Sequence, residues 1–527
     1  MKSTMNHSFG ITPSVDIQRS VFDRSHGHKT TFDAGKLVPI YCDEALPGDT
    51  FKMDASIFAR MTTPIFPIMD NIFMDIHFFS VPMRQLWENF RPFMGENISG
   101  SGPVGLTDYV MPIQSITSLN EGTLEDYLGM PIGKAIDYNA LYRRAYIHIV
   151  NEWYRDQNSL GNYPMYTGDG PDTDQALGYP LANRHKRLDY FTSCTPWPQK
   201  GNPSYIPLGT EAPVIGIGKF DQTYTGTSGL AYESDAGTDT YPSYSFVAGT
   251  GSNTSFIVEE DPDNTGYPNI RVDLTQAAAA TINDLRAAFA IQKFLERDSR
   301  NGTRYSELVK SHFGVTFMDV TYRPEFLGGG TVPVNINPVP QQSSTDATTP
   351  QGNLAAFATA GGSNIGFVKS FTEHCIVYGI ISVRADLTYQ QGLNRMFTRS
   401  SRLDYYWPEF AHLGEQTVHL GEIYHQGTSS DDNVFGYQER YAEYRYKPSI
   451  VTGKMRSAAT DSLDAWHLAQ EFITQPALNA AFTWEDPPMD RILAVSNQPH
   501  FIFDSYFRLK CIRPMPMFGT PGLVDHF

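Results

Sequence analysis

One short run in the sequence brings positive charge and aromatic rings together. It consists of four consecutive residues: Arg184, His185, Lys186 and Arg187. Tyr190 and Phe191 follow it directly. A single strand of nucleic acid suits such a run, because phosphates meet the cations and bases stack on the rings. The run is short for a nucleic-acid-binding protein, so a DNA contact is one interpretation, and a subunit contact or a solvated loop is the other.

Two other clusters carry side chains that could bind a metal ion. One is acidic and consists of Glu259, Glu260, Asp261 and Asp263. Carboxylate oxygens are ligands of Ca²⁺, but the spacing does not match an EF-hand, so a solvated acidic turn is favoured. His26 and His28 are separated by a single glycine and offer fewer ligands than a zinc site needs. The sequence predicts no bound metal and no cofactor.

Motifs of catalysis are missing from the sequence. It contains no phosphate-binding G-x-x-x-x-G-K-[ST], no H-E-x-x-H and no G-x-S-x-G. Gly216 and Gly218 lack the third glycine of a dinucleotide-binding loop. A carbohydrate-active β-sandwich enzyme would need two carboxylates at glycosidase separation, and no spacing in the sequence indicates such a pair. We therefore expect a protein that is not an enzyme.

Composition narrows the class of protein further. The 527 residues carry a formal net charge of −17, which argues against a general DNA-binding protein because counterion release needs clustered Lys and Arg. Charged residues make up only 18% and aromatic residues 13%. Few charges and many rings indicate that neighbouring subunits cover much of the surface. The 43 glycines and 35 prolines favour β-strands joined by long loops.

The cysteines and the apolar runs indicate where the protein is made. None of the four cysteines, Cys42, Cys194, Cys375 and Cys511, lies in a C-x-x-C motif. Two of them lie in apolar strand patterns, so we expect reduced thiols and maturation in a reducing cytoplasm. The N-terminus lacks the apolar core of a signal peptide. No run of 18 apolar residues occurs, and we expect no membrane span.

Alternation of apolar and polar residues predicts strands over residues 71–82, 331–339, 374–389 and 501–513. In the last of these, Phe501, Phe503 and Phe507 share the apolar face. A period near 3.6 predicts helices over residues 139–157, 281–302 and 461–476. Long connections separate the strands, which is the pattern of one β-sandwich with large insertions. A jelly roll accommodates such insertions at its two ends.

The largest insertion is acidic and rich in Gly, Ser, Thr and Tyr. Residues 202–272 contain two basic and nine acidic residues. Aromatic residues recur too often for simple disorder, so we expect a self-packed excursion on the outer surface.

Several long stretches resemble the major capsid proteins of gokushoviruses, small tailless single-stranded DNA phages of the Microviridae. The stretches include NRHKRLDYFTSCTPWPQKG at residues 183–201 and RMFTRSSRLDYYWPEFAHLGEQ at residues 395–416. Residues 22–61, 285–315 and 507–527 show the same similarity. The resemblance covers nearly the whole chain, from Phe22 to Phe527.

This resemblance implies an eight-stranded antiparallel jelly-roll β-sandwich whose large inserted loops contain several helices. Sixty copies would form a T=1 icosahedral shell around circular single-stranded DNA. Residues 37–212 and 273–527 would form the jelly-roll core, and residues 213–272 a protrusion at the threefold axis. The protrusion is expected to contact a host surface receptor, with four candidate residues: Tyr232, Tyr241, Tyr244 and Phe246.

Two further parts of the chain carry expectations of their own. Residues 1–36 hold five Lys or Arg and three Asp, and we expect an inward-facing arm. A small basic internal packaging protein, which the resemblance implies, would offset the acidity of shell and genome. The Pro-rich tail after Arg513 is expected to lie extended over a neighbouring subunit or the sandwich.

A receptor-binding spike remains the other alternative function, because the Tyr- and Gly-rich insertion suits adhesion.

Overall fold

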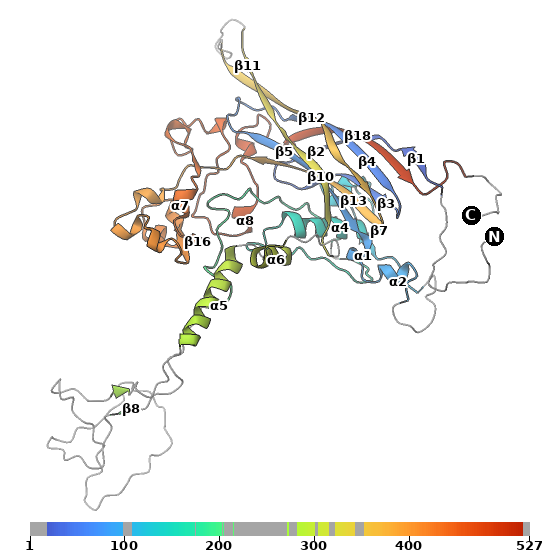
Figure 1. Cartoon of the computed structure of the whole chain (residues 1–527). Helices are drawn as coiled ribbons and strands as arrows, with labels where there is room; N and C mark the ends of the chain where they lie inside the picture. Colours follow the sequence, from blue (N-terminus) through green and yellow to red (C-terminus); the bar gives the residue numbers. More distant parts are fainter. Residues whose placement is uncertain are drawn as a thin grey trace, which may run out of the picture. The chain divides into compact units, whose positions relative to one another are not determined.

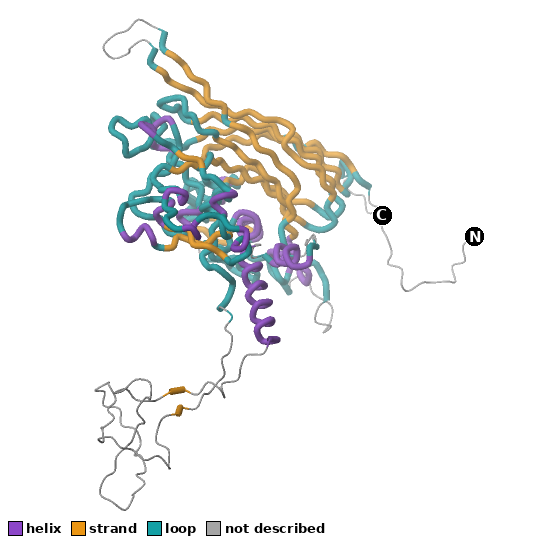
Figure 2. The backbone as a smooth tube through the Cα atoms, turned by 60° about the vertical axis from the view of Figure 1, so that its left-hand side comes forward, coloured by secondary structure: helices purple, strands orange, loops and turns teal. Residues whose placement is uncertain are grey.

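Two antiparallel β-sheets form the centre of the computed structural model. The model describes residues 18–97, 108–173, 175–202, 204, 214–215, 271–272, 282–300, 304–315, 322–342 and 352–519. The strands of both sheets run side by side in Figures 1 and 2. The sequence-based prediction of a mainly β protein is confirmed.

The larger sheet has six strands in the order β1-β18-β4-β12-β11, with β2 also paired to β18. Their bounds are β1 Ser20–Asp23, β2 His26–Phe32, β4 Thr50–Met61, β11 Asn335–Pro340, β12 Leu354–Ser370 and β18 Phe501–Arg513. The second sheet has the order β10-β5-β13-β3. Its strands are β3 Val38–Ala45, β5 Ile72–Pro82, β10 Glu325–Pro333 and β13 Cys375–Ala385.

A first hydrophobic core fills the space between the two sheets. β18 shows the predicted alternation, with Phe501, Phe503 and Phe507 buried at 1% exposure or less. Met74, Ile76 and other residues of β5 come into the same core from the second sheet. Because successive residues of a strand point to opposite faces, the other side of β18 is left outside this core.

A second layer covers the outer face of the four-stranded sheet. It contains α4 (Leu141–Ile149) with the π-helical turn Val150–Tyr154, and the short helices α1 (Met83–Leu86), α2 (Phe90–Phe93) and α3 (Leu124–Tyr127). Every residue of β13 is therefore buried, including Ser382 and Arg384, which the alternation placed on a polar face. The prediction of a half-buried strand here was wrong, because a helical layer replaces solvent.

Two of the three predicted helices are present. α4 and the adjoining π-helical turn lie within residues 139–157, and α5 (Ile282–Arg300) lies within residues 281–302. The helix predicted over residues 461–476 was wrong, since only a 3₁₀ turn, Asp464–Trp466, forms there. The backbone amide of Leu468 instead donates to the carboxylate of Asp70 at 2.6 Å, so an external acceptor replaces a helical bond.

The strand predicted over residues 331–339 is divided between the two sheets. β10 ends at Pro333 in the four-stranded sheet, and β11 begins at Asn335 in the six-stranded sheet. Val334 lies at the crossing and is buried at 7% exposure. Pro333 has no backbone N–H to donate, so it can stand where the hydrogen bonds between β10 and β5 end.

A loop-built lobe lies in the chain between β13 and β18. Its strands are β14 (Thr388–Tyr389), β15 (Glu415–His419), β16 (Val434–Glu439) and β17 (Ser449–Ile450), and its helices are α7 (Ala442–Arg445) and α8 (Ala480–Thr483). Eight 3₁₀ turns complete the lobe within the described residues, and a third apolar cluster joins its Tyr389 and Phe435 to Phe191 from an earlier segment. The lobe is a long connection between strands, and its short helices α7 and α8 lie outside residues 461–476, where the sequence predicted a helix.

The chain divides into two compact units, of which one is residues 199–298. Within this unit, β8 (Val214–Ile215) pairs antiparallel with β9 (Arg271–Val272), which closes the two ends of the insertion. The other unit contains α6 (Tyr305–Phe313), and in it β6 (Ile113–Ile116) pairs with β7 (Ile136–Asn139). Among the residues described, no helix is long and apolar enough to cross a membrane. All four cysteines are free thiols.

Candidate functional site

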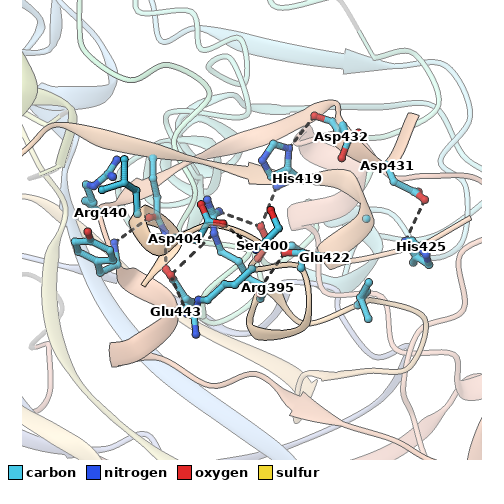
Figure 3. Close-up of a pocket in the computed structure, with 17 residues that line it drawn as sticks. Arg395, Ser400, Asp404, His419, Glu422, His425, Asp431, Asp432, Arg440 and Glu443 are labelled. Carbon is cyan, nitrogen blue, oxygen red and sulfur yellow. Dashed lines mark hydrogen bonds and ion pairs between the residues drawn. The ribbon is translucent and has the colours of Figure 1, made fainter. Parts of the chain in front are cut away.

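The loop-built lobe encloses a polar cavity of about 370 Å³, shown in Figure 3. Charged side chains from β15, α7 and several 3₁₀ turns point into it. Their arrangement decides whether the cavity could carry out chemistry, because a catalytic carboxylate or imidazole must be free to meet a substrate.

Arginines hold two glutamate carboxylates of the cavity. The guanidinium of Arg395 lies 3.3 Å from Glu422 and 4.0 Å from Glu443, and Arg399 lies 3.2 Å from Glu443. Burial raises the pKa of Glu422, although Arg395 and the amide of His419 oppose that shift. Since one guanidinium bridges both carboxylates, neither stands as a free acid or nucleophile of the kind that a glycosidase uses.

The remaining acidic groups of the cavity hold turns of the lobe. Asp431 accepts hydrogen bonds from the amides of Gln426, Gly427 and Thr428, and the first of these bonds is the main cause of its lowered pKa. His425 lies 3.0 Å from the same carboxylate. The polar groups therefore cross-link a lobe that has little regular secondary structure, and the geometry supports a structural role.

The basic run of the sequence is mostly built into the interior. Arg184 forms an ion pair of 2.6 Å with Asp75 of β5 and donates to the hydroxyl of Ser382 at 2.6 Å. Arg384 reaches the same carboxylate at 2.8 Å. Burial opposes ionisation of Asp75, but Arg184 and the hydrogen bond from Thr331 bring its pKa below the usual value.

The next two residues of the run are a half-buried histidine and a lysine that makes internal contacts. Burial lowers the pKa of His185 to about 4. The ammonium of Lys186 donates to Gln470 at 2.7 Å and to the carbonyl of Phe482 at 2.6 Å, and burial lowers its pKa to about 8. A cation with two internal acceptors and 9% exposure cannot also meet a phosphate.

Arg187 is the one member of the run with an exposed side chain. Tyr190 and Phe191, the rings that follow it, are buried at 4% and 3% exposure in the third apolar cluster. A DNA contact by the run stays a prediction, and the geometry leaves Arg187 as the side chain free to make it. The sequence alone did not show that Arg184 forms an internal ion pair, because its acidic partner, Asp75, lies more than a hundred residues away.

The other predicted sites lie partly outside the described residues. Tyr232, Tyr241, Tyr244 and Phe246 belong to this group, as does the acidic cluster of residues 259–263. His26 and His28 lie on β2, and burial lowers the pKa of His28. Among the side chains that the structure places, no group of three or more His, Cys, Asp or Glu could hold a metal ion.

Comparison with known proteins gives matches along nearly the whole chain. A family model described as capsid protein (F protein) matches residues 11–523. The capsid protein VP1 of Bdellovibrio phage phiMH2K is 42% identical over 547 residues, which covers 99% of this chain and 98% of the relative. The capsid protein VP1 of Chlamydia phage 1 is 43% identical over 595 residues, with the same coverage.

A third relative, with a lower sequence identity, also matches along nearly its full length. The capsid protein VP1 of Spiroplasma virus 4 is 36% identical over 546 residues, which covers 98% of this chain and 97% of the relative. None of the three alignments leaves out a large part of either chain.

Proposed function

The chain belongs to the capsid protein (F protein) family of phages, and we propose that sixty copies of it form a closed T=1 icosahedral shell around a circular single-stranded DNA genome. Membership in this family makes it a structural protein of the virion that associates with copies of itself. The observation that carries the proposal is the similarity of 36–43% over almost the full length to three phage capsid proteins.

The surface of the described residues supports association with other subunits. Large apolar side chains are exposed at many places, among them Leu188 at 78%, Phe397 at 68% and Ile450 at 65%. Apolar side chains gathered at a surface suit contacts that become buried in an assembly. Many modest contacts, multiplied over a closed shell, give strong association without tight pairwise affinity.

For the core we propose the eight-stranded jelly roll. The strand orders β2-β18-β4-β12 and β10-β5-β13-β3 support it, since the chain passes repeatedly from one sheet to the other. β1 and β11 then extend the edges of the six-stranded sheet. Loops that leave the ends of such a sandwich can lengthen without disturbing its core.

For residues 213–272 we propose a protrusion at the threefold axis that contacts a host receptor. Support comes from the pairing of β8 with β9, which brings the two ends of the insertion together. Because the ends already meet, deletion of residues 216–270 with a short glycine linker is expected to leave the shell closed and remove its knobs. Loss of the shell itself in this variant would contradict the assignment.

Residues 1–36 are proposed to face the genome and the small basic internal protein. In the described part of this segment, β1 and β2 pair with successive halves of β18, so the strands belong to the six-stranded sheet. The tail after Arg513 is proposed to lie over a neighbouring subunit, and Phe518, its last described ring, is 83% exposed.

Electron microscopy of the purified protein tests the proposed function. The expected result is small spherical particles that bear knobs at the threefold axes. A protein that stays a monomer or trimer under all conditions would fit a receptor-binding spike, and turnover of glycans would fit a carbohydrate-active enzyme. Either result would overturn the proposal.

A further inference from the structure

The two sheets of the sandwich differ in what covers their outer faces. Helices and loops bury the outer face of the four-stranded sheet, so that all of β13 is buried. On the six-stranded sheet, alternate residues of β18 and β4 remain exposed or half-exposed along the whole length of the strands. Figure 1 labels the strands of this sheet. We call its uncovered side the open face.

Aromatic rings on the open face have small neighbours. Tyr506 of β18 is 50% exposed and lies in register between Gly27 of β2 and Ser56 of β4. Phe58 of β4 is 55% exposed and lies in register between Gly361 of β12, which leaves one side of the ring open, and Asp504 of β18. A glycine or serine beside a ring leaves the flat side of the ring accessible, and an accessible ring is a platform on which a base can stack.

Cations lie beside these rings without a matching set of carboxylates. Lys52 of β4 lies directly opposite Lys510 of β18 in the register. Like charges placed opposite each other across two strands destabilise the pair. Neither lysine, nor Arg60 at the other end of β4, forms an ion pair with a carboxylate among the residues that the structure describes. Asp23 of β1 lies opposite Lys510 on its other side and offsets part of the repulsion, and an external anion at Lys52 would relieve the rest.

The charged groups of the open face sum to a positive charge, although the chain as a whole carries −17. The cations are Lys29, Lys52, Arg60, Arg508 and Lys510, and the carboxylates are Asp23, Asp54 and Asp504. Two ion pairs, Lys29 with Asp504 at 2.7 Å and Arg508 with Asp54 at 3.4 Å, are largely exposed. Exposed ion pairs of this kind contribute little free energy.

We propose that the open face binds single-stranded DNA, with bases stacked on Tyr506 and Phe58 and phosphates held by Lys52, Lys510 and Arg60. Residues two positions apart on a strand are ~7 Å apart, so Arg60 lies ~7 Å along β4 from Phe58, and Lys510 lies ~14 Å along β18 from Tyr506. This inference rests on the proposed function, because it assigns the surface of the capsid protein that meets the genome. It also replaces residues 184–186 as the main candidates for that contact.

The face fits DNA better than another copy of the chain. A second copy is acidic overall but brings charges of both signs. Single-stranded DNA brings only negative charge and a base for every phosphate, which matches a face of mixed rings and cations. The small basic internal protein would be repelled by the same lysines.

Binding of an oligothymidylate to unassembled full-length chains tests the assignment. The probe carries a fluorophore and has roughly twenty nucleotides, more than the ~4–16 that one single-strand-binding module covers. In Lys52→Gln/Lys510→Gln, loss of two phosphate contacts is expected to lower the slope of log affinity against log salt by about 1.4 in magnitude. In Tyr506→Thr/Phe58→Thr, affinity is expected to fall by about tenfold or more because two stacked bases are lost.

A matched control removes one charge and one ring elsewhere on the surface. Lys134 and Tyr166 are both exposed and lie in segments outside the six-stranded sheet. Lys134→Gln/Tyr166→Thr is expected to bind the probe as the unchanged chain does. The lysine variant is also expected to unfold no earlier than the unchanged chain, since it removes a like-charge pair, and this shows that weaker binding does not come from misfolding.

Assembly of the same proteins, followed by electron microscopy, separates this inference from the proposed function. If unchanged chains form particles but do not bind the probe, the open face is not a DNA surface and the shell proposal stands. If the open-face variants bind the probe normally but no longer assemble, the face is a subunit interface and the inference is overturned. If the unchanged chain binds DNA through this face but never forms particles, the proposed function fails instead.

Discussion

The ion pair between Arg184 and Asp75 gives a direct test of the structural role of the basic run. Replacing Arg184 with alanine leaves the carboxylate of Asp75, which is 4% exposed, without the partner that lies 2.6 Å away. The substitution also removes the donor to Ser382. We expect the free energy of unfolding to fall, because a buried charge loses much of its compensation.

The size of the effect follows from the partners that remain. Breaking a buried pair by removing one member costs ~3–5 kcal/mol. Asp75 keeps Arg384 at 2.8 Å and the hydroxyl of Thr331 at 2.5 Å, so we expect the lower end of that range, about 3 kcal/mol. In a chain that already carries Asp75→Asn, Arg184→Ala should lower the free energy of unfolding by less, because the carboxylate charge that Arg184 compensates is absent.

Urea unfolding of unassembled chains, followed by tryptophan fluorescence, measures this cost. Arg187→Ala is the control, because its exposed side chain should contribute no more than ~0.5 kcal/mol. The folded state lowers the pKa of Asp75, so its stabilisation is present above the unfolded pKa of ~3.9 and is lost as the pH falls through the folded value. The difference between the unchanged chain and Arg184→Ala should therefore shrink below about pH 4. Equal stability of Arg184→Ala and Arg187→Ala at neutral pH would refute the reasoning.

Three further changes have defined outcomes. A methyl group at Gly366 would lie 2.0 Å from the carbonyl oxygen of Met53, so Gly366→Ala should prevent folding of the six-stranded sheet. Gly361→Ala is the control, because the nearest atom to its methyl group would be 4.0 Å away, and it should yield folded chains as soluble as the unchanged chain. Folding lowers the pKa of Lys186 to about 8, so between about pH 8 and 10 the unfolded chain binds one proton more than the folded chain. The free energy of unfolding should therefore rise with pH in this range. Lys186→Met should remove that rise in a pH series of unfolding midpoints. Deletion of residues 520–527 should abolish assembly, as seen by light scattering, without lowering the unfolding midpoint of the subunit, and particles of normal size would show that the tail is dispensable.

The sequence was sufficient to predict strands that have solvent on one side. β18 alternates because one face meets the core and the other is uncovered, and its pattern could be recognised directly. β13 carries Ser382 and Arg384 among apolar residues, and nothing local shows that Arg184 from a loop and Asp75 from another strand contact them. Arg384 is buried because Asp75, from a distant strand, compensates its charge.

The failures of prediction have a common physical cause, which is partners from distant parts of the chain. The apolar spacing of residues 461–476 is that of a helix, but Asp70 takes the amide of Leu468 and the segment follows a loop course. The basic run around Lys186 resembled a DNA contact, yet acceptors at Gln470 and Phe482 draw the ammonium inward. Local sequence shows which groups need partners, and only the fold shows where the partners are.

The mass of the assembled particle tests the central claim most directly. Sixty copies of a 59.0 kDa chain give a protein shell of about 3.5 MDa, which mass photometry or native mass spectrometry of DNA-free particles can measure. A single closed species at that mass, spherical in electron micrographs, is the predicted result. A stable species of one or three chains, or open filaments of variable mass, would contradict the account of the protein as the unit of a closed shell.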